Sequence, residues 1–323
     1  MEENNIKKIT KKSSTEKTVA KIKTKPLSNA EIKKAFDERI RAWFEANKEY
    51  KILVSPTKLL EANANIGLPT RYWNPKMKPY IYSKKNGRNY TIDLLKCMVF
   101  LSNAYNFLYD LTKEGGQILL VGTHGNIIKE HVKEEAKRCG CYFINQRWLG
   151  GTLTNFRTIN RSIMKLNKLI MMQLNEDIKK YSKKEQLQKY KETEKLAKFL
   201  GGIRTMKGLP QAIIVIDPIV DHNAVVEAKK LHIPVIALAN VNADPDLFDF
   251  TIPCNTSSVK TTYLFTSILC DAICEAKNEP TKVVGKSDDE IILPNLVKNN
   301  QSAEIINRKQ FTKAATVTEE KAK

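Results

Sequence analysis

The sequence predicts an α/β protein with a parallel β-sheet flanked by helices and with an inserted antiparallel coiled-coil helical hairpin. Two observations lead to this fold class. Short, almost wholly apolar runs alternate with helical patterns in both halves of the chain, and a long stretch of helical periodicity separates the halves. Strands buried on both faces are typical of parallel sheets, whose neighbouring strands are connected by helices.

The two halves of the α/β domain are expected at residues 56–155 and 203–280. Apolar runs of strand length predict buried strands at 117–122, 141–144, 212–216 and 235–238. Amphipathic stretches predict the connecting helices at 127–138 and 224–231.

The hairpin is expected at residues 156–202. Apolar residues recur at helical spacing in two runs, which are Ile159, Ile163, Leu166 and Ile170, and Leu187, Tyr190, Leu196 and Phe199. Ser182 and Glu185 form a capping box that restarts the helix after a turn near Tyr181. A first helix that includes residues 163–180 would be about 27 Å long at ~1.5 Å per residue, so the hairpin should project from the domain.

Three further segments flank the domain and hairpin. Residues 1–27 are rich in Lys, Ser and Thr and are expected to form a disordered tail. Residues 28–55 begin with a capping box at Ser28 and Glu31 and predict an amphipathic helical extension, which packs on its own domain or docks on a neighbouring protein. Residues 281–323 lose periodicity and are expected to form a flexible tail.

The charge balance favours a polyanionic partner. The chain has 54 Lys and Arg against 35 Asp and Glu, which gives a formal net charge of +19. No apolar run approaches the roughly 18 residues that a membrane-spanning helix needs, so we expect a soluble, cytoplasmic protein with no membrane partner. The six cysteines are interpreted as reduced thiols, and the Cys139-Gly140-Cys141 run, which resembles half of a zinc site, lacks a matching second pair.

One motif, at residues 145–156, combines cationic, aromatic, amide and glycine residues directly after a predicted strand. Arg147 has the geometry to bridge phosphate oxygens or stack on a base, and Gly150 and Gly151 allow close approach of the backbone to a ligand. This mixture suits RNA better than a small metabolite. The alternative is a helix entry, with Trp148 and Phe156 in the core and Thr154 or Asn155 as the N-cap.

This motif resembles the signature of the S-two family of small-subunit ribosomal proteins, in its bacterial form. Further blocks follow in the family's order, so that the resemblance covers about residues 56–278; they lie at residues 70–81, 208–217, 232–238 and 244–253. The resemblance implies a flavodoxin-like core and a hairpin that touches ribosomal RNA. It also implies a position between the head and body of the small subunit, near the exit of the messenger channel, and a role in recruiting the largest, messenger-binding protein of that subunit.

We therefore expect a structural constituent of the small ribosomal subunit that binds rRNA and neighbouring ribosomal proteins and catalyses no reaction. No cofactor, metal or small-molecule substrate is expected. The tryptophans have core packing as their alternative role. The residues expected to contact RNA are Arg71, Trp73, Lys76, Lys78, Arg88, Gln146, Arg147, Trp148, Asn155, Arg157, Lys165 and Lys168.

The alternative function is an α/β enzyme that binds a nucleotide or phosphosugar at the turn of residues 122–126. This turn follows a strand and precedes a helix, where anions often bind, but it lacks the G-x-G-x-x-G spacing. Aspartates near strand ends, among them Asp217, Asp244 and Asp246, are candidates for holding magnesium or acting as an acid and base pair. Turn and cap chemistry explains both features more simply.

Overall fold

The structure is a computed structural model that describes residues 52–85 and 88–294. The expected tail at 1–27 and nearly all of the helical extension at 28–55 lie outside the described residues, as does the chain from residue 295. The description below concerns the α/β body and its hairpin, which belong to one compact unit.

The body is built on a five-stranded, all-parallel sheet with the strand order β5-β4-β6-β7-β8. Its strands are β4 (Ile118–Val121), β5 (Tyr142–Ile144), β6 (Ala212–Val215), β7 (Val235–Ala239) and β8 (Phe250–Pro253). Every residue of β4, β6 and β7 is buried, as expected for apolar strands covered on both faces. The predicted fold class is confirmed, and so are the four predicted strands.

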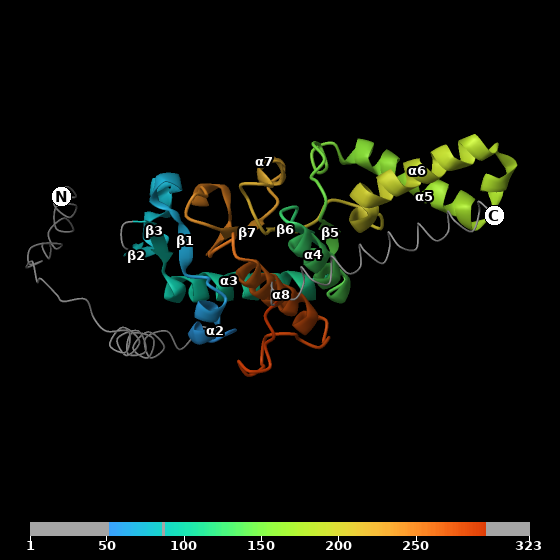
Figure 1. The fold of residues 1–323 in the computed structure, drawn as a ribbon. Coiled ribbons are helices and arrows are strands. Elements are labelled where there is room, and N and C mark those ends of the chain that lie inside the picture. The colour runs from blue at the N-terminus through green and yellow to red at the C-terminus, as the bar shows by residue number, and fades with distance from the viewer. Residues whose placement is uncertain (1–51, 86–87, 295–323) are drawn as a thin grey trace, which may run out of the picture. The chain divides into compact units, whose positions relative to one another are not determined.

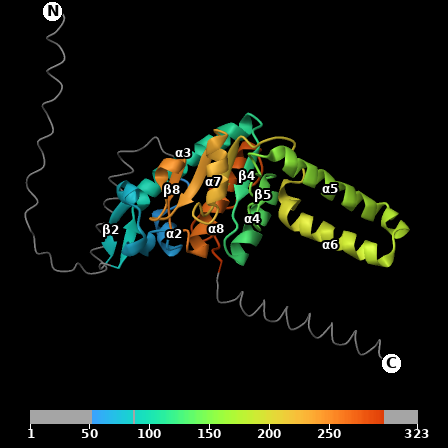
Figure 2. The same cartoon turned by 90° about the horizontal axis from the view of Figure 1, so that it is seen from above.

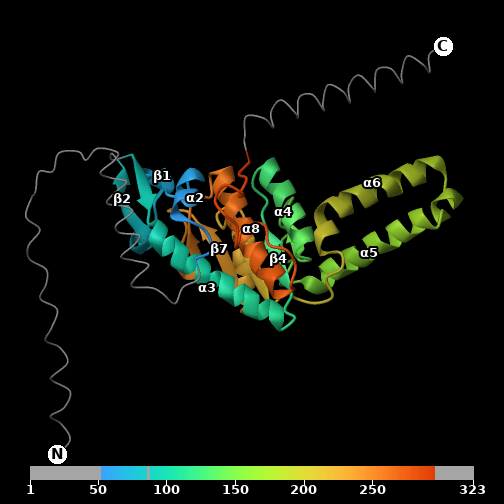
Figure 3. The same cartoon turned by 90° about the horizontal axis from the view of Figure 1, so that it is seen from below.

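Helices cover both faces of this sheet. Helices α3 (Leu94–Lys113), α4 (Asn126–Arg138) and α8 (Val259–Ala276) pack side by side and lie in front of the sheet in Figure 3. Helix α7 (His222–Lys230) lies on the other face, which Figure 2 shows. The core beneath α7 extends to Trp148, Leu153 and Ile163, so the base of the hairpin shares the core of the sheet.

The hairpin consists of α5 (Phe156–Leu174) and α6 (Lys183–Leu200), which run antiparallel beyond the β5 edge of the sheet (Figures 1 and 2). The predicted capping box is present, because the Ser182 and Glu185 side chains each bond the other's backbone N–H. The first helix ends at Leu174 rather than at residue 180. Glu176 has a left-handed φ of +58°, which stops the α-helix, and a 3₁₀ turn, η3 (Asp177–Lys180), follows.

The hairpin returns to the body through η4 (Gly201–Ile203), which lies against β5. A Cβ at Gly202 would stand 2.1 Å from the carbonyl oxygen of Phe143, so only glycine allows this approach. Helix α6 ends at Leu200, and Gly202 sets how closely the hairpin's end packs on the sheet edge.

A second, three-stranded antiparallel sheet precedes the parallel one, and we did not predict it. Its order is β1-β3-β2, with β1 (Ile66–Pro69), β2 (Ile81–Lys85) and β3 (Asn89–Ile92). Before and between these strands lie α2 (Pro56–Glu61), η1 (Thr70–Tyr72) and η2 (Pro75–Tyr80). The small sheet packs on the body through Tyr90, Ile92 and Val241.

Residues 281–294 differ from the expected flexible tail. The carboxylate of Asp271 on α8, which is fully buried, accepts hydrogen bonds from the backbone N–H groups of Lys282 (2.9 Å), Val283 (2.6 Å) and Val284 (3.0 Å). Val283, Val284 and Ile291 are buried. The segment is anchored by its own apolar residues and by the Asp271 carboxylate on the preceding helix, which helical or strand periodicity within the segment does not indicate.

The cysteines lie mainly in the core. All six are free thiols, and five of them, all but Cys141, are buried. Cys270 and Cys274 pack inside α8's buried face, as predicted. Within residues 52–85 and 88–294, no three His, Cys, Asp or Glu side chains gather as a metal site would require. None of the described helices combines the length and apolar character needed to cross a membrane.

Candidate nucleic-acid interface

The loop of residues 145–155 connects β5 to α5 and turns its side chains in opposite directions. Asn145 is buried and its amide donates to the carbonyl oxygen of Lys129 on α4 at 2.8 Å, which fixes the start of the loop. Arg147 is exposed, whereas the next residue, Trp148, is buried in the core beneath α7. The loop therefore presents a guanidinium to solvent from a firmly held backbone.

Trp148 has the core role that the sequence left open as its alternative. Its side chain is 7% exposed, and its indole N–H donates to Glu227 at 3.0 Å. A ring enclosed in this way has no free face on which a base can stack. We therefore leave Trp148 out of the proposed RNA contacts, although it anchors the loop that carries Arg147.

Glu227, on α7, holds the loop in place through hydrogen bonds. Its carboxylate accepts hydrogen bonds from the backbone N–H groups of Gly151, Leu153 and Thr154 at 2.8, 3.0 and 3.2 Å. It also accepts bonds from the Trp148 indole and the Thr154 hydroxyl. Burial alone would raise the pKa of Glu227, but these hydrogen bonds outweigh it and hold the pKa below the usual range for a glutamate.

Gly151 is required by the conformation of the loop. Its φ is +84°, in the left-handed region, and a Cβ there would also stand 3.2 Å from the Cβ of Asn155. A Cβ at Gly150 would meet nothing within 4 Å, so that residue leaves open space beside the loop.

The sequence analysis missed Glu227, although a signal was available. In the predicted helix at 224–231, it stands with Ala224, Ala228 and Leu231 at the spacing of one apolar face. A carboxylate on a face that must be buried needs partners, and here the partners are the donors of the loop.

Helix α5 continues the cationic surface from the loop. Arg157, Arg161, Lys165 and Lys168 are all exposed and follow one another at intervals of three or four residues, which places them along one side of the helix. Helix α5 contains no acidic residue, and Lys165 pairs with Glu192 of α6. We call these four residues the α5 row. Arg161 was not among the predicted contacts, although its position four residues after Arg157 would have identified it.

Asn155 is the N-cap of α5 but makes no side-chain capping bond. It is exposed, and Gln146 is half-buried. The structure thus brings Gln146, Arg147, Asn155 and Arg157 together at the base of the hairpin, next to the α5 row.

The other predicted contacts lie on the small antiparallel sheet and its 3₁₀ turns, which Figure 1 places at the opposite end of the parallel sheet from the hairpin. Arg71, Lys78 and Arg88 are exposed, and the Arg71 guanidinium lies 4.5 Å from the ring centre of the exposed Tyr72. Trp73 is half-buried and packs against Tyr90, with ring centres 5.0 Å apart.

Lys76 differs from its neighbours because its charge is already paired. Its ammonium lies 2.8 Å from Asp244 and 2.7 Å from Asp246, and hydrogen bonds to these carboxylates raise its pKa. A phosphate would have to compete with both carboxylates. We therefore expect less from Lys76 than from Arg71 or Lys78 in RNA binding.

The turn proposed as an enzyme's ligand site is explained by packing and local bonding. A Cβ at Gly122 would stand 2.8 Å from side-chain atoms of both Ile216 and Val132, so glycine lets α4 approach the sheet. Thr123 donates its backbone N–H and its hydroxyl to the buried Asp221, at 3.2 and 2.8 Å. Gly125 has a φ of +68° and precedes α4. These features favour a tight turn.

The candidate carboxylates make turn and cap interactions. Asp217 accepts the backbone N–H of Ile219 at 3.1 Å, as in a turn. Asp244 caps the 3₁₀ turn η5 (Pro245–Leu247) in addition to pairing with Lys76. This agrees with the simpler interpretation made from the sequence.

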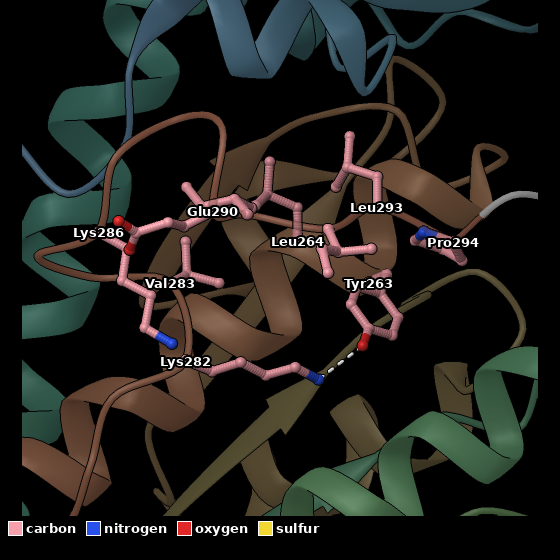
Figure 4. Close-up of a pocket in the computed structure, with 10 residues that line it drawn as sticks. Tyr263, Leu264, Lys282, Val283, Lys286, Glu290, Leu293 and Pro294 are labelled. Carbon is pink, nitrogen blue, oxygen red and sulfur yellow. Dashed lines mark hydrogen bonds between the residues drawn. The ribbon is translucent and has the colours of Figure 1, made fainter.

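A cavity of about 420 Å³ lies between α8 and the segment 281–294 (Figure 4). Tyr263 and Leu264 line it from α8, and Lys282, Lys286 and Glu290 line it from the segment. The Lys282 ammonium donates to the Tyr263 hydroxyl at 2.6 Å, which the figure marks as a dashed line. None of its lining residues is among those predicted to contact RNA.

An α/β body that carries an exposed row of cations beside a cationic loop has the features of a nucleic-acid-binding protein, and comparison with known families shows which kind. A family model described as ribosomal protein S2 matches residues 59–276. The chain therefore belongs to the ribosomal protein S2 family, and this membership implies a structural rather than an enzymatic role.

Several curated relatives are named small ribosomal subunit protein uS2. The protein of Malacoplasma penetrans is 51% identical over 271 residues, which cover 82% of this chain and 74% of that protein. The protein of Ureaplasma urealyticum is 48% identical over 278 residues, with 85% and 77% covered. The protein of Mycoplasmoides gallisepticum is 42% identical over 284 residues, with 86% and 87% covered.

Proposed function

We propose that this protein is a structural constituent of the small ribosomal subunit in the cytoplasm and binds the rRNA of that subunit between its head and body. Family membership and the names of the relatives support the subunit. The observation that carries RNA binding is the continuous cationic surface of the Arg147 loop and the α5 row, on a backbone held by buried contacts.

The mechanism is positional binding. Exposed Arg and Lys side chains neutralise phosphates and release counterions, which supplies affinity that falls as salt rises. Residues along α5 rise by about 1.5 Å each, so the α5 row spans roughly 16 Å of helix. Arg157, Arg161 and Lys168 are presented to several phosphates at once, whereas Lys165 is also paired with Glu192. Arg71, Lys78 and Arg88 form a second contact surface on the antiparallel sheet.

We further propose that the protein supports subunit assembly and helps to recruit the largest, messenger-binding protein of the subunit. Two basic surfaces on one compact unit would connect separate parts of the rRNA, which is how a protein without catalytic groups contributes to assembly. The sequence resemblance is the support for the recruitment of the messenger-binding protein.

The test is replacement of Arg147 by Ala. We expect at least about a tenfold loss of affinity for small subunits washed free of this protein, because a hydrogen bond to a charged group is worth ~1.5–3 kcal/mol. The slope of the logarithm of the binding constant against the logarithm of the salt concentration should also fall in magnitude by about one, because one fewer counterion is released. The variant should fold normally, since the Arg147 side chain is exposed.

The matched control is Lys286→Ala, which removes the same charge from an exposed position on the segment 281–294. The measurement is competition of each tagged variant with the unmodified protein for the washed subunits, at two salt concentrations. Equal incorporation of Arg147→Ala and Lys286→Ala would contradict the assignment of the loop to RNA binding.

A further inference from the structure

The carboxylate of Glu227, on α7, accepts hydrogen bonds from five donors of the loop of residues 145–155. The helix and the loop are far apart in the sequence. The Glu227 side chain is 8% exposed, and both of its oxygens are used. Oε1 accepts from Trp148 and Gly151, and Oε2 accepts from Leu153 and Thr154. Charge-assisted bonds of this kind are stronger than those between neutral groups.

The arrangement of the donors shows what the carboxylate holds. Trp148 directly follows Arg147, and Gly151 begins the stretch of backbone that enters α5. The two anchors lie on either side of the exposed Gly150. The carboxylate therefore fixes the residue that directly follows Arg147 and the backbone beyond it. On the other side of Arg147, Asn145 is held by the carbonyl oxygen of Lys129, while the Arg147 side chain itself stays in solvent.

We infer that Glu227 is a positioning residue for RNA. It holds the loop in one conformation before RNA binds, so the Arg147 guanidinium contacts the phosphate backbone with little further loss of conformational entropy. The inference rests on the proposed function. A contact made from an ordered loop binds more tightly than the same contact made from a mobile one, because the loop loses less conformational freedom on binding. Nothing in this role requires Glu227 to touch RNA.

The contrasting possibility is a carboxylate that only stabilises the fold at the base of the hairpin. Both roles predict some loss of stability when Glu227 is changed, so stability does not distinguish them. They differ in how Glu227 and Arg147 interact. A positioning residue acts through Arg147, and its effect on RNA affinity disappears when Arg147 is absent.

The experiment is a double-mutant cycle between Glu227→Gln and Arg147→Ala, with affinity for the washed small subunits as the readout. Glutamine keeps the shape but loses the charge and turns an amide donor toward the loop's own N–H donors. We expect Glu227→Gln alone to weaken binding about tenfold, and to weaken the Arg147→Ala protein less than about twofold, since contacts in one network are not additive.

The control cycle pairs Glu227→Gln with Lys168→Ala. Lys168 lies 13 residues beyond Asn155, or about 20 Å along α5, so its effect should add to that of Glu227→Gln. Trp148→Phe is a milder second variant, which removes one donor to Glu227 and keeps an aromatic ring in the core. It should weaken binding two- to threefold, and only when Arg147 is present.

The outcomes separate the two proposals. If Arg147→Ala binds normally, the RNA role of the loop fails and the inference fails with it. If Arg147→Ala binds weakly but Glu227→Gln and Trp148→Phe act equally with and without Arg147, the positioning role alone is overturned. If Glu227→Gln does not fold, the Trp148→Phe cycle decides the question.

Discussion

Replacing Asp271 by Asn should loosen the segment 281–294 from the body of the protein. The fully buried Asp271 carboxylate accepts three consecutive backbone N–H groups from residues 282–284. It also pairs with the Arg138 guanidinium of α4 at 2.8 Å. Asparagine fits the same volume, but it has no charge and directs an N–H₂ group at the donors that the carboxylate satisfied.

The magnitude follows from these contacts. Removing one partner of a buried ion pair costs about 3–5 kcal/mol. Arg138 keeps a second carboxylate, because Glu135 accepts its guanidinium at 2.6 and 2.9 Å. We therefore expect the lower value, about 3 kcal/mol, which for a domain of this size lowers the melting temperature by roughly 6–12 °C.

Two measurements test this prediction. Thermal unfolding gives the global loss, and hydrogen exchange of a peptide that spans residues 280–288 gives the local one. The Val283 and Val284 amides should exchange much faster in the variant, since their acceptor has been changed. Asp289→Asn is the matched control, because Asp289 lies on the same segment and is exposed.

The reasoning would be refuted by either of two results. A stability loss below about 1 kcal/mol would show that the carboxylate contributes no more than an ordinary surface group. Unchanged exchange at residues 282–284, together with a lower melting temperature, would show that Asp271 stabilises α8 but does not hold the segment.

Two further predictions concern stability. Gly202→Ala should destabilise the protein by about 1–3 kcal/mol in chemical denaturation, because its Cβ would overlap the Phe143 carbonyl. Gly201→Ala, whose Cβ meets nothing within 4 Å, should change it by less than ~0.5 kcal/mol, and equal effects would contradict the packing argument. Burial lowers the pKa of His131 to about 4, so the unfolded chain binds a proton that the folded protein does not. Roughly 3 kcal/mol of stability should be lost as the pH falls from ~6.5 to ~4. His131→Phe should flatten that dependence, and an unchanged slope would assign it to another group.

Much of the parallel sheet was predictable because its strands are continuous apolar runs. β4, β6 and β7 are buried along their whole length, and apolar runs this short favour buried strands over helices, which need more residues. The small antiparallel sheet gave no comparable signal. Pro69 ends β1, and polar residues fill most of β2, so its strands are defined by their pairing with β3 and not by their own composition.

The candidate site was predictable where chemistry depends on residue type and exposure. Arg147 and Arg157 are exposed, as a role in RNA binding requires. Long-range partners were not predictable. Nothing local indicates that Trp148 donates to Glu227, 79 residues later, or that Lys76 is paired with Asp244 and Asp246. Such partners are chosen by the tertiary fold, and they decide which polar groups stay available for RNA.

The anchoring of residues 281–294 brings the last segment of the described chain next to the first. The carboxylate of Asp288 accepts the hydroxyl groups of Ser55 and Thr57, the latter at 2.8 Å, across more than 230 residues of sequence. Ser55 also caps α2, so the first helix of the body begins where its last segment passes. A short peptide would suffice to join these two points, and new ends opened in a surface turn would leave the sheet order intact. The body should therefore tolerate circular permutation, with residues near Ser55 and Asp288 joined by a short linker.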